Sequence, residues 1–209
     1  SGAGNRKVFT FSTWVKLASG SNSKSFFTAG ADAQNKTECG MQSGALRFEN
    51  EVSNDRDLKD TKAILKDRSA WYHLVYAIDL TQSTNNDKVK MYINGVLQTE
   101  FGSEDDTFAN VDSNINAAAT HYIGKRGYNG TRYHDGYMAE THFIDGTQLT
   151  ADSFGEEKED VWIPKQYTGS YGTNGFYLKF DQTGSGTPSS TTRGADSSGN
   201  GHHFTTSAV

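Results

Sequence analysis

Residues 71–98 read WYHLVYAIDLTQSTNNDKVKMYINGVLQ, and this stretch predicts three β-strands in series. Its first part, Trp71–Asp79, alternates between two faces, as a strand does. Both faces are largely apolar, with Trp71, His73, Val75 and Ala77 on one and Tyr72, Leu74, Tyr76 and Ile78 on the other. Such a strand is typical of the interior of a two-layer structure. We therefore expect a central strand of a β-sandwich, and a cost of about 3–5 kcal/mol for Trp71→Ala if the indole is buried.

The second part of the stretch predicts a hairpin. A polar loop, Thr81–Asp87, leads into the alternating run Val89–Ile93, and Asn94-Gly95 follows directly. Asn-Gly between two such runs is the strongest short-range hairpin signal, because both residues tolerate the positive φ of a type I′ turn. A helix over Leu74–Leu80 is disfavoured, since β-branched and aromatic residues are frequent there and no cap precedes them.

Composition limits the class of protein. The 209 residues suit one large all-β domain. Only 34% of them are hydrophobic, but 12% are aromatic, and large rings bury more area than aliphatic side chains. No run approaches the ~20 apolar residues of a membrane span, so we expect no membrane insertion. A net charge of −5 without a basic stripe argues against nucleic acid as a partner.

Two further features concern the cysteine and the start of the chain. The single cysteine, Cys39, excludes an internal disulfide and a cysteine metal site, and we expect it in the core or in a loop. Residues 1–5, SGAGN, do not resemble a signal peptide, and we interpret them as the interior of a longer protein.

Other strands are predicted along the rest of the chain. They are Val8–Leu17, Phe26–Ala29, Glu38–Met41, Leu46–Phe48, His121–Gly124, Tyr137–Asp145 and Phe176–Phe180. Strict alternation in the sixth of these would place Tyr137, Ala139, Thr141 and Phe143 opposite Met138, Glu140, His142 and Ile144. Short strands at roughly 8–12-residue spacing, with Gly and Asn turns between them, indicate a sandwich or a barrel.

Several segments are predicted to lie outside the sheets. Glu51–Arg68 is the most charged, and we interpret it as a solvated loop with a short strand at Ala63–Leu65. Phe101–Ala118 is a long polar connection of the kind found over the mouth of a sandwich. Thr150 is expected to cap a helical turn that ends near Phe154. The Gly/Ser/Thr-rich tail, residues 184–209, should run over the surface of a domain formed by residues 1–183.

An ordered set of motifs carries a family resemblance. The segments FTFSTWVK, WYHLVYAID, VKMYINGVL, HYIG and GYMAETHFIDGTQLT occur in the order found in concanavalin A-like, laminin G-like domains, over residues 8–155. The resemblance implies an all-β, two-sheet antiparallel jelly-roll sandwich.

The ends of the chain resemble those of phage virion proteins with this fold. The segments are GNRKVFTFSTWVK at the start, and KQYTGSYGTNGFYLKF and DSSGNGHHF at the end. This implies a tail-fibre, attachment or capsid-decoration component of the virion, working as a homo-oligomer or on a symmetric virion site. Its partners would be other virion proteins or a host-surface glycan. In such domains DSSGNG usually precedes the first strand, whereas here it occupies residues 196–201. The tail would then supply an edge strand near His202–Thr206, or lead to a further domain.

Residues capable of catalysis do not form a convincing set. The related glucanases need Glu-x-Asp-x-x-Glu on one strand, and no such spacing occurs. The acidic run at residues 156–160 is interpreted as a solvated face. His73 lies between apolar neighbours and is interpreted as a hydrogen-bonded core residue. His202 and His203 would point to opposite faces of a strand and cannot chelate one ion together. We therefore expect no enzymatic activity and no catalytic residues.

Calcium is the cofactor that the resemblance leaves open. Many laminin G-like domains hold one ion at a loop rim, and hard oxygen ligands are frequent in Thr81–Asp87 and in Glu104-Asp105-Asp106. Neither run has the spacing of a calcium-binding loop, so solubilising loops are the alternative, and the metal ligands stay unassigned.

The segment Lys125–Asp135, KRGYNGTRYHD, is the predicted binding site. It joins two predicted strands and should project as a loop from a rigid scaffold. Its predicted ligand-binding residues are Tyr128, Asn129, Arg132, Tyr133, His134 and Asp135. Tyrosine rings stack on sugar faces or anchor protein contacts, and the other groups donate or accept hydrogen bonds. The alternative is a loop that packs its tyrosines back onto the sandwich or into a neighbouring subunit.

Three functions therefore compete. The preferred hypothesis is a non-enzymatic virion module that binds a host-surface glycan, the capsid or the tail. The second is a glycan-active enzyme on the same scaffold, which the absent carboxylate pair disfavours. The third is a laminin G-like domain of a secreted cellular protein, which the terminal motifs disfavour.

Overall fold

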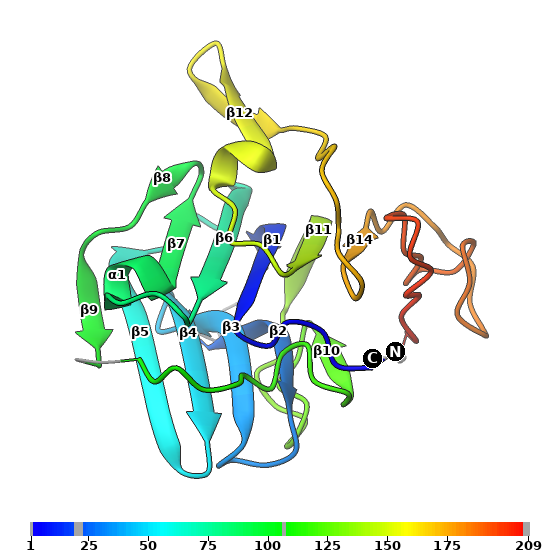
Figure 1. The fold of residues 1–209 in the computed structure, drawn as a ribbon. Coiled ribbons are helices and arrows are strands. Elements are labelled where there is room, and N and C mark those ends of the chain that lie inside the picture. The colour runs from blue at the N-terminus through cyan, green and yellow to red at the C-terminus, as the bar shows by residue number, and fades with distance from the viewer. Residues whose placement is uncertain (1, 19–22, 106–107, 207–209) are drawn as a thin grey trace.

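Two six-stranded antiparallel sheets pack face to face in the computed structural model, which describes residues 2–18, 23–105 and 108–206 (Figure 1). The first sheet has the order β14 (Phe176–Leu178), β11 (Gly136–Asp145), β1 (Val8–Leu17), β6 (Tyr72–Asp79), β7 (Val89–Ile93) and β8 (Val96–Leu97). The second has the order β10 (His121–Ile123), β2 (Lys24–Gly30), β3 (Lys36–Gln42), β4 (Ala45–Val52), β5 (Asp55–Ile64) and β9 (Phe101–Glu104). The predicted all-β, two-sheet sandwich is confirmed.

The remaining elements are small. A hairpin of β12 (Gly155–Lys158) and β13 (Val161–Pro164) stands on the outer face of the first sheet and projects from the top of Figure 1. The 3₁₀ turn η1 (Ala151–Ser153) precedes it, and the short helix α1 (Asn85–Lys88) lies in the predicted polar loop. The turn after Thr150 is as predicted, but the Thr150 hydroxyl contacts Asp152 instead of capping it. No helix within the described residues is long and apolar enough to cross a membrane.

Strand β6 is an interior strand with two apolar faces, as its sequence predicts. It pairs with β1 on one side and β7 on the other. Leu74, Tyr76 and Ile78 enter the core between the sheets. Val75 and Ala77 enter a second cluster beneath η1 and the β12–β13 hairpin. Burial of both faces explains why this strand carries so few polar residues.

The core between the sheets is rich in aromatic rings. Its largest fully buried members include Phe9, Phe11, Phe27, Phe48 and Phe143. The Phe11 and Phe27 rings, from opposite sheets, stack with centroids 5.1 Å apart. Cys39 on β3 is fully buried among them. Large rings therefore compensate for the low hydrophobic fraction of the chain.

The hairpin between β7 and β8 forms at the predicted residues. Asn94 and Gly95 have φ values of 48° and 81°, as a type I′ turn requires. The Asn94 side chain also accepts a hydrogen bond of 2.8 Å from the backbone N–H of His73. A Cβ on Gly95 would lie 2.7 Å from the Trp162 ring. The glycine thus serves both the turn and the packing of β13 above it.

The predicted solvated loop Glu51–Arg68 is wrong, because most of it is the ten-residue strand β5. Its central residues are buried, including Lys59 and Asp60. The Arg47 guanidinium pairs with Asp60 through two hydrogen bonds of 2.8 and 2.7 Å. Charged side chains can occupy an interior strand when opposite charges face them, and here those partners come from neighbouring strands.

The predicted burial of Trp71 is also wrong. The strand begins at Tyr72, which pairs with Val15 at the end of β1, so Trp71 lies just beyond the sheet. Trp71 is 40% exposed, and its ring rests against Tyr137, with ring centroids 6.4 Å apart. Alternation identified the strand correctly but did not locate its first residue.

A bulge in β11 breaks the predicted alternation. Ser12 pairs with His142, whereas Trp14 pairs with Ala139, so two residues of β11 oppose Thr13. Glu140 takes the extra position, with a φ of 48°. The bulge exchanges the faces, so that Met138 and Phe143 both contact the core while Tyr137 points outward.

The described part of the tail, residues 184–206, packs beside β14. The Asp196 carboxylate accepts hydrogen bonds from the backbone N–H groups of Tyr177, Ser198 and His202, at 2.9, 2.8 and 2.9 Å. The Phe204 ring packs edge-on against Phe176, with centroids 4.9 Å apart. No strand forms within residues 202–206, and β1 lies between β6 and β11, so the tail does not complete an open N-terminal edge as predicted.

Candidate functional site

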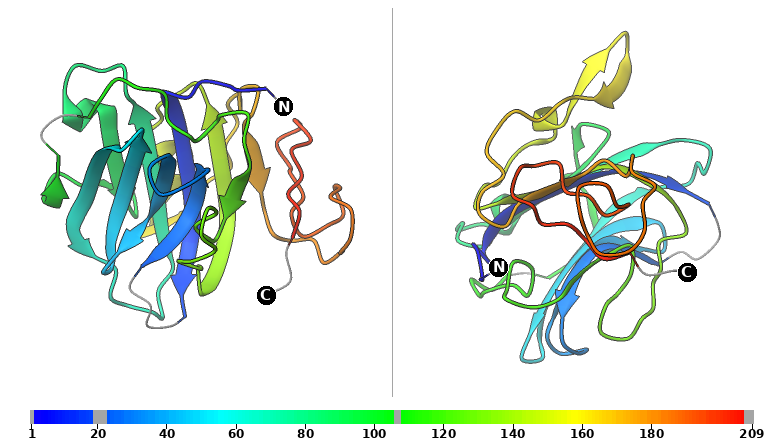
Figure 2. Two further views of the ribbon diagram at one scale, coloured as in Figure 1. Left: turned by 90° about the horizontal axis from the view of Figure 1, so that it is seen from below. Right: turned by 90° about the vertical axis from the view of Figure 1, so that its right-hand side faces the viewer.

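A pocket opens where the edge strands of the two sheets, β10 and β14, lie on the same side of the sandwich (Figure 2). Its volume is about 1310 Å³. Core rings, including Phe27, Phe143 and Phe176, form part of its wall. The right-hand view of Figure 2 looks onto this side and shows the tail passing in front of it. We call this side of the molecule the open edge.

Aromatic side chains with large exposed areas surround the pocket. Tyr133 and Tyr137 line it and are 51% and 64% exposed. Phe180 lines it too, is 37% exposed, and has a φ of 60°, a rare conformation for a bulky residue. Trp71 extends the set through its contact with Tyr137. Exposed rings at a concave site are suited to stacking on a ligand, because their faces are apolar and rigid.

The charge of the pocket differs from that of the whole chain. Lys125 and Arg193 contribute cations, and no aspartate or glutamate occurs among the described residues that line it. Burial lowers the pKa of His121, and it lowers the pKa of His134 to about 4. Both rings are therefore neutral near pH 7, and Lys125 and Arg193 carry the positive charge there.

The predicted binding loop, Lys125–Asp135, is folded back on the sandwich. Its backbone closes on itself through Arg126 N–H to Thr131 O at 2.8 Å and His134 N–H to Gly124 O at 2.7 Å. The Arg132 carbonyl also accepts a hydrogen bond of 2.9 Å from Ser25 on β2. These bonds fix the loop on β2 and β10, so its side chains have defined directions.

The loop sends its predicted site residues to three different places. Tyr133 and His134 line the pocket. Tyr128 lies under the Arg126 guanidinium, 5.7 Å from the ring centroid, and Arg132 pairs with Glu38 at 3.3 Å. The other two are exposed: the Asn129 side chain accepts a hydrogen bond of 2.7 Å from Thr131, and Asp135 follows His134.

The Arg126 and Arg132 side chains belong to a compensated ionic cluster on the outer face of the second sheet. Arg126 pairs with the nearly fully buried Glu38. The neighbouring Glu49 lies within 3.1 Å of Lys36 and 2.8 Å of Arg56. Burial raises the pKa of Glu49, but these cationic partners outweigh it and lower the pKa to about 2. The cluster joins strands to the loop and has a structural role.

The Ser12–His73 pair has the wrong proton arrangement for nucleophile activation. Trp162 Nε1 can only donate, and it lies 2.9 Å from His73 Nδ1. His73 Nε2 therefore carries the ring proton and donates to Ser12 Oγ, 2.8 Å away. Burial also lowers the pKa of His73 to about 3. The prediction of a hydrogen-bonded core histidine is confirmed.

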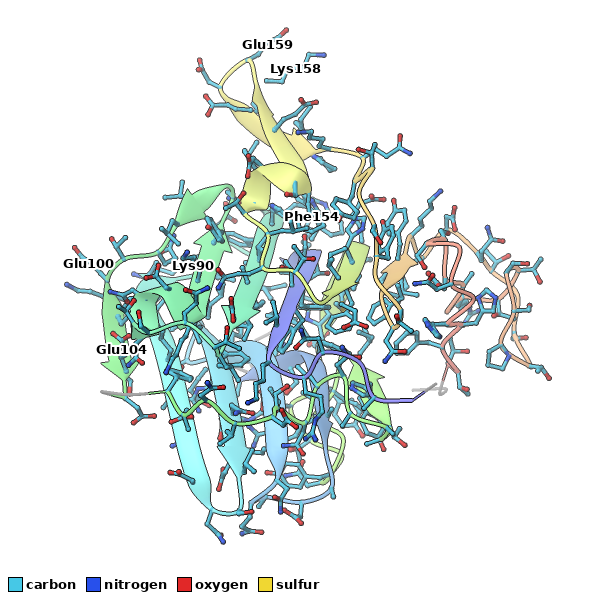
Figure 3. The ribbon with its side chains drawn as sticks, in the orientation of Figure 1. Lys90, Glu100, Glu104, Phe154, Lys158 and Glu159 are labelled. Carbon is cyan, nitrogen blue, oxygen red and sulfur yellow. The ribbon has the colours of Figure 1, made fainter. Side chains whose placement is uncertain are left out.

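The acidic segments considered for calcium are bonded to protein groups. Asp87 lies 3.3 Å from Lys90, and Glu104 lies 2.8 Å from Lys59. Across the described residues, no three His, Cys, Asp or Glu side chains converge on a point that could hold a metal ion. Figure 3 shows Lys158 and Glu159 at the tip of the β12–β13 hairpin, in solvent as predicted for that acidic run. The expectation of no cofactor, with calcium left open by the family resemblance, stays a prediction.

Comparison with known proteins places these features in a known fold. A laminin G family model described as "Concanavalin A-like lectin/glucanases superfamily" matches residues 3–153. No curated protein sequence matches the chain significantly.

Solved structures are similar in fold at low identity. CBM40 of the Ruminococcus gnavus IT-sialidase, bound to α2,3-sialyllactose, gives a TM-score of 0.50 at 16% identity over 72% of this chain and 80% of that chain. A heptameric SAP-like pentraxin from Limulus polyphemus gives 0.48 at 17% identity, over 71% and 68% of the two chains. Tailspike protein 2 of bacteriophage CBA120 (its enzymatically active domain) gives 0.46 at 12% identity, over 74% and 24%. At these identities the likeness concerns the fold alone.

Proposed function

Because the chain belongs to the concanavalin A-like lectin/glucanases superfamily, we propose that it is a non-enzymatic glycan-binding module whose site is the pocket at the open edge. The observation that carries the proposal is the group of exposed rings, Tyr133, Tyr137 and Phe180, around one concave site. Sugar rings present apolar C–H faces that stack on such side chains, while their hydroxyl groups bond to polar neighbours.

The lining of the pocket supports binding without hydrolysis. Glycoside hydrolysis normally needs two carboxyl groups that flank the scissile bond. The described residues that line the pocket include no aspartate or glutamate. The Glu140 carboxylate lies outside the lining and accepts a 2.5 Å hydrogen bond from Tyr177. A glycan held at the open edge would therefore meet no paired acid and base.

We further propose that the glycan is displayed on a host surface and that the module works in a phage virion, as an adhesion or decoration component. The terminal segments GNRKVFTFSTWVK and DSSGNGHHF support this setting by their resemblance to phage virion proteins. Several copies on a symmetric particle would turn weak single-site binding into strong attachment. Quantitative mass spectrometry of purified particles would test the setting, and absence of the chain from them would contradict it.

A glycan array compares the wild type with Tyr137→Ala and Tyr133→Ala. We expect the wild type to bind a subset of glycans, and each variant to lose about tenfold or more in affinity, because stacked rings contribute strongly to recognition. Val96→Ala is the control, since Val96 is 64% exposed at the opposite side, on β8. Glycans left intact after long incubation would agree with the proposal. Turnover, or binding unaffected by both tyrosine substitutions, would contradict it.

A further inference from the structure

The pocket at the open edge reverses the charge of the molecule around it. The chain has 25 acidic and 20 basic residues, with a net charge of −5. The described lining of the pocket nevertheless contains Lys125 and Arg193 and no acidic residue. A concave, partly apolar site with charges of one sign concentrates ligands of the opposite sign.

Lys125 is held in position beside the pocket. Its carbonyl accepts a hydrogen bond of 2.9 Å from Thr28, and its ammonium lies 4.9 Å from the centroid of the Tyr122 ring. The Tyr122 ring covers Gly127, where an added Cβ would lie 2.0 Å from a ring carbon. Gly127 thus lets the loop pack under the ring that contacts Lys125. The cation stands on a rigid part of the loop, which lowers the entropic cost of binding.

Arg193 reaches the same pocket from the tail. Its backbone N–H donates to Gly184 at 3.1 Å. The next residue, Gly194, accepts a hydrogen bond of 2.8 Å from Phe204, and an added Cβ there would lie 2.2 Å from the Phe204 carbonyl oxygen. Two segments far apart in sequence therefore contribute one cation each to the lining of one pocket.

Neither Lys125 nor Arg193 has an acidic partner within the described part of the chain, whereas both arginines of the loop Lys125–Asp135 do. Arg126 and Arg132 are both paired with Glu38. Lys125 and Arg193 form no ion pair among the described residues. A cation without an internal counter-charge, next to exposed rings, is available to an external anion.

We propose that the ligand is an anionic glycan, with its sugar ring on Tyr133 and Tyr137 and its charged group paired with Lys125 and Arg193. This inference rests on the proposed function, and it adds the chemical class of the ligand. Carboxylate and sulfate groups share the required chemistry, since both are anionic acceptors of charge-assisted hydrogen bonds.

An array that presents each glycan backbone in neutral, carboxylated and sulfated form tests the proposal. Suitable sets are lactose with 3′-sialyllactose and 3′-sulfolactose, and galactose with galacturonate oligomers. We expect the charged forms to bind about tenfold more tightly than their neutral counterparts, and to weaken as NaCl rises from 50 to 500 mM. The carboxylated and sulfated arms identify which anion is preferred.

Substitutions at the two cations separate this inference from the proposed function. Lys125→Gln and Arg193→Gln should remove most of the preference for charged forms and leave residual binding through the rings. Lys158→Gln is the charge-matched control, because Lys158 lies at the hairpin tip, away from the pocket (Figure 3). Equal binding of neutral and charged forms that Tyr137→Ala abolishes would overturn the anionic preference and leave the glycan-binding function. Absence of all glycan binding would overturn both.

Discussion

The two lateral edges of the sandwich differ in how they are covered. At the β8–β9 side, the Lys59 ammonium is nearly fully buried between Glu104 at 2.8 Å and Asn86 at 2.9 Å, and lies 3.9 Å from the Phe101 ring centroid. Helix α1 adds Asn86 to this closed edge, and Figure 3 shows Glu104 and Lys90 there. At the open edge, core rings face a pocket with the tail in front of it.

The difference indicates which edge of the sandwich can bind a ligand while the core between the sheets stays packed. At the closed edge, the partners of the charged Lys59 side chain come from β9 and α1. Opening this edge would leave a buried charge without its partners. The open edge is bordered by a tail held through Asp196 and Phe204, which opening would expose to water at a smaller cost. A ligand can therefore reach the aromatic rings at the open edge while the closed edge keeps the two sheets together.

The largest expected effect is at the closed edge. Lys59→Ala should lower the free energy of unfolding by about 3 kcal/mol, because it leaves Glu104 and Asn86 without their shared donor and removes the contact with Phe101. Lys125→Ala at the open edge should change it by less than about 0.5 kcal/mol. Urea unfolding of both variants measures the contrast. Similar losses for both would mean that the two edges do not differ in this way.

Acid should destabilise the fold through three histidines, of which His134 lies at the open edge. Burial lowers the pKa of His73 and of His142 to about 3 and that of His134 to about 4. Between these values and the ordinary pKa near 6.5, the unfolded chain binds protons that the folded chain does not, so stability falls as the pH falls. From pH 7 to pH 5 we expect a loss of about 2 kcal/mol for each histidine.

His134→Gln tests the share that belongs to the open edge. The variant should lose less free energy of unfolding between pH 7 and pH 5 than the wild type. Hydrogen exchange at pH 5 should show faster exchange at β10 than at β9. A pH profile that His134→Gln leaves unchanged would rule out this residue as a source of acid sensitivity.

The tail should contribute an intermediate amount. Asp196→Ala removes the acceptor for the backbone N–H groups of Tyr177, Ser198 and His202, and should cost about 2 kcal/mol. Asp181→Ala, at an exposed position just before the tail, is the control. Thermal unfolding of both variants measures the effect, and deletion of residues 196–209 should lower the melting temperature at least as far. Equal melting temperatures for Asp196→Ala and the wild type would show that the tail is not held by this carboxylate.

A small effect on stability is expected at Trp71, whereas its sequence predicted a large one. Because Trp71 is 40% exposed, Trp71→Ala should cost less than about 1 kcal/mol. Its contact with Tyr137 places it beside the pocket, so glycan affinity should fall severalfold. Calorimetric titration and denaturant melts on one preparation separate the two effects. A loss above about 3 kcal/mol would restore the role of a buried core residue.

Local patterns predicted the elements whose causes are local. The alternation in β6 and the Asn94-Gly95 turn depend on neighbours in sequence, and both are confirmed. Strand β5 was missed because the groups that neutralise Asp60 and Lys59 lie on β4 and β9. The bulge at Glu140 left no composition signal, since its neighbours remain compatible with either face.

The candidate site follows the same division. The loop sequence predicted Tyr133 and His134, which line the pocket. It did not predict Tyr137, Phe180 or Arg193, because the pocket exists only after the tail folds beside β10 and β14. The sequence signal that would have included Tyr137 is an aromatic residue at the end of a predicted strand, next to the predicted loop. No local pattern indicates that Arg193 reaches the same place.

Cys39 is a natural probe of how often the two sheets separate. Its thiol is fully buried in β3, and burial raises its pKa well above the ordinary value. While the sheets are packed together, a reagent cannot reach the thiol and the reactive thiolate does not form. Modification by a thiol reagent therefore requires the sheets to separate. The modification rate reports how often they do so, and no engineered probe is needed. A glycan that binds only the closed sandwich would stabilise it against separation of the sheets, and the modification of Cys39 would then be slower when the glycan is bound.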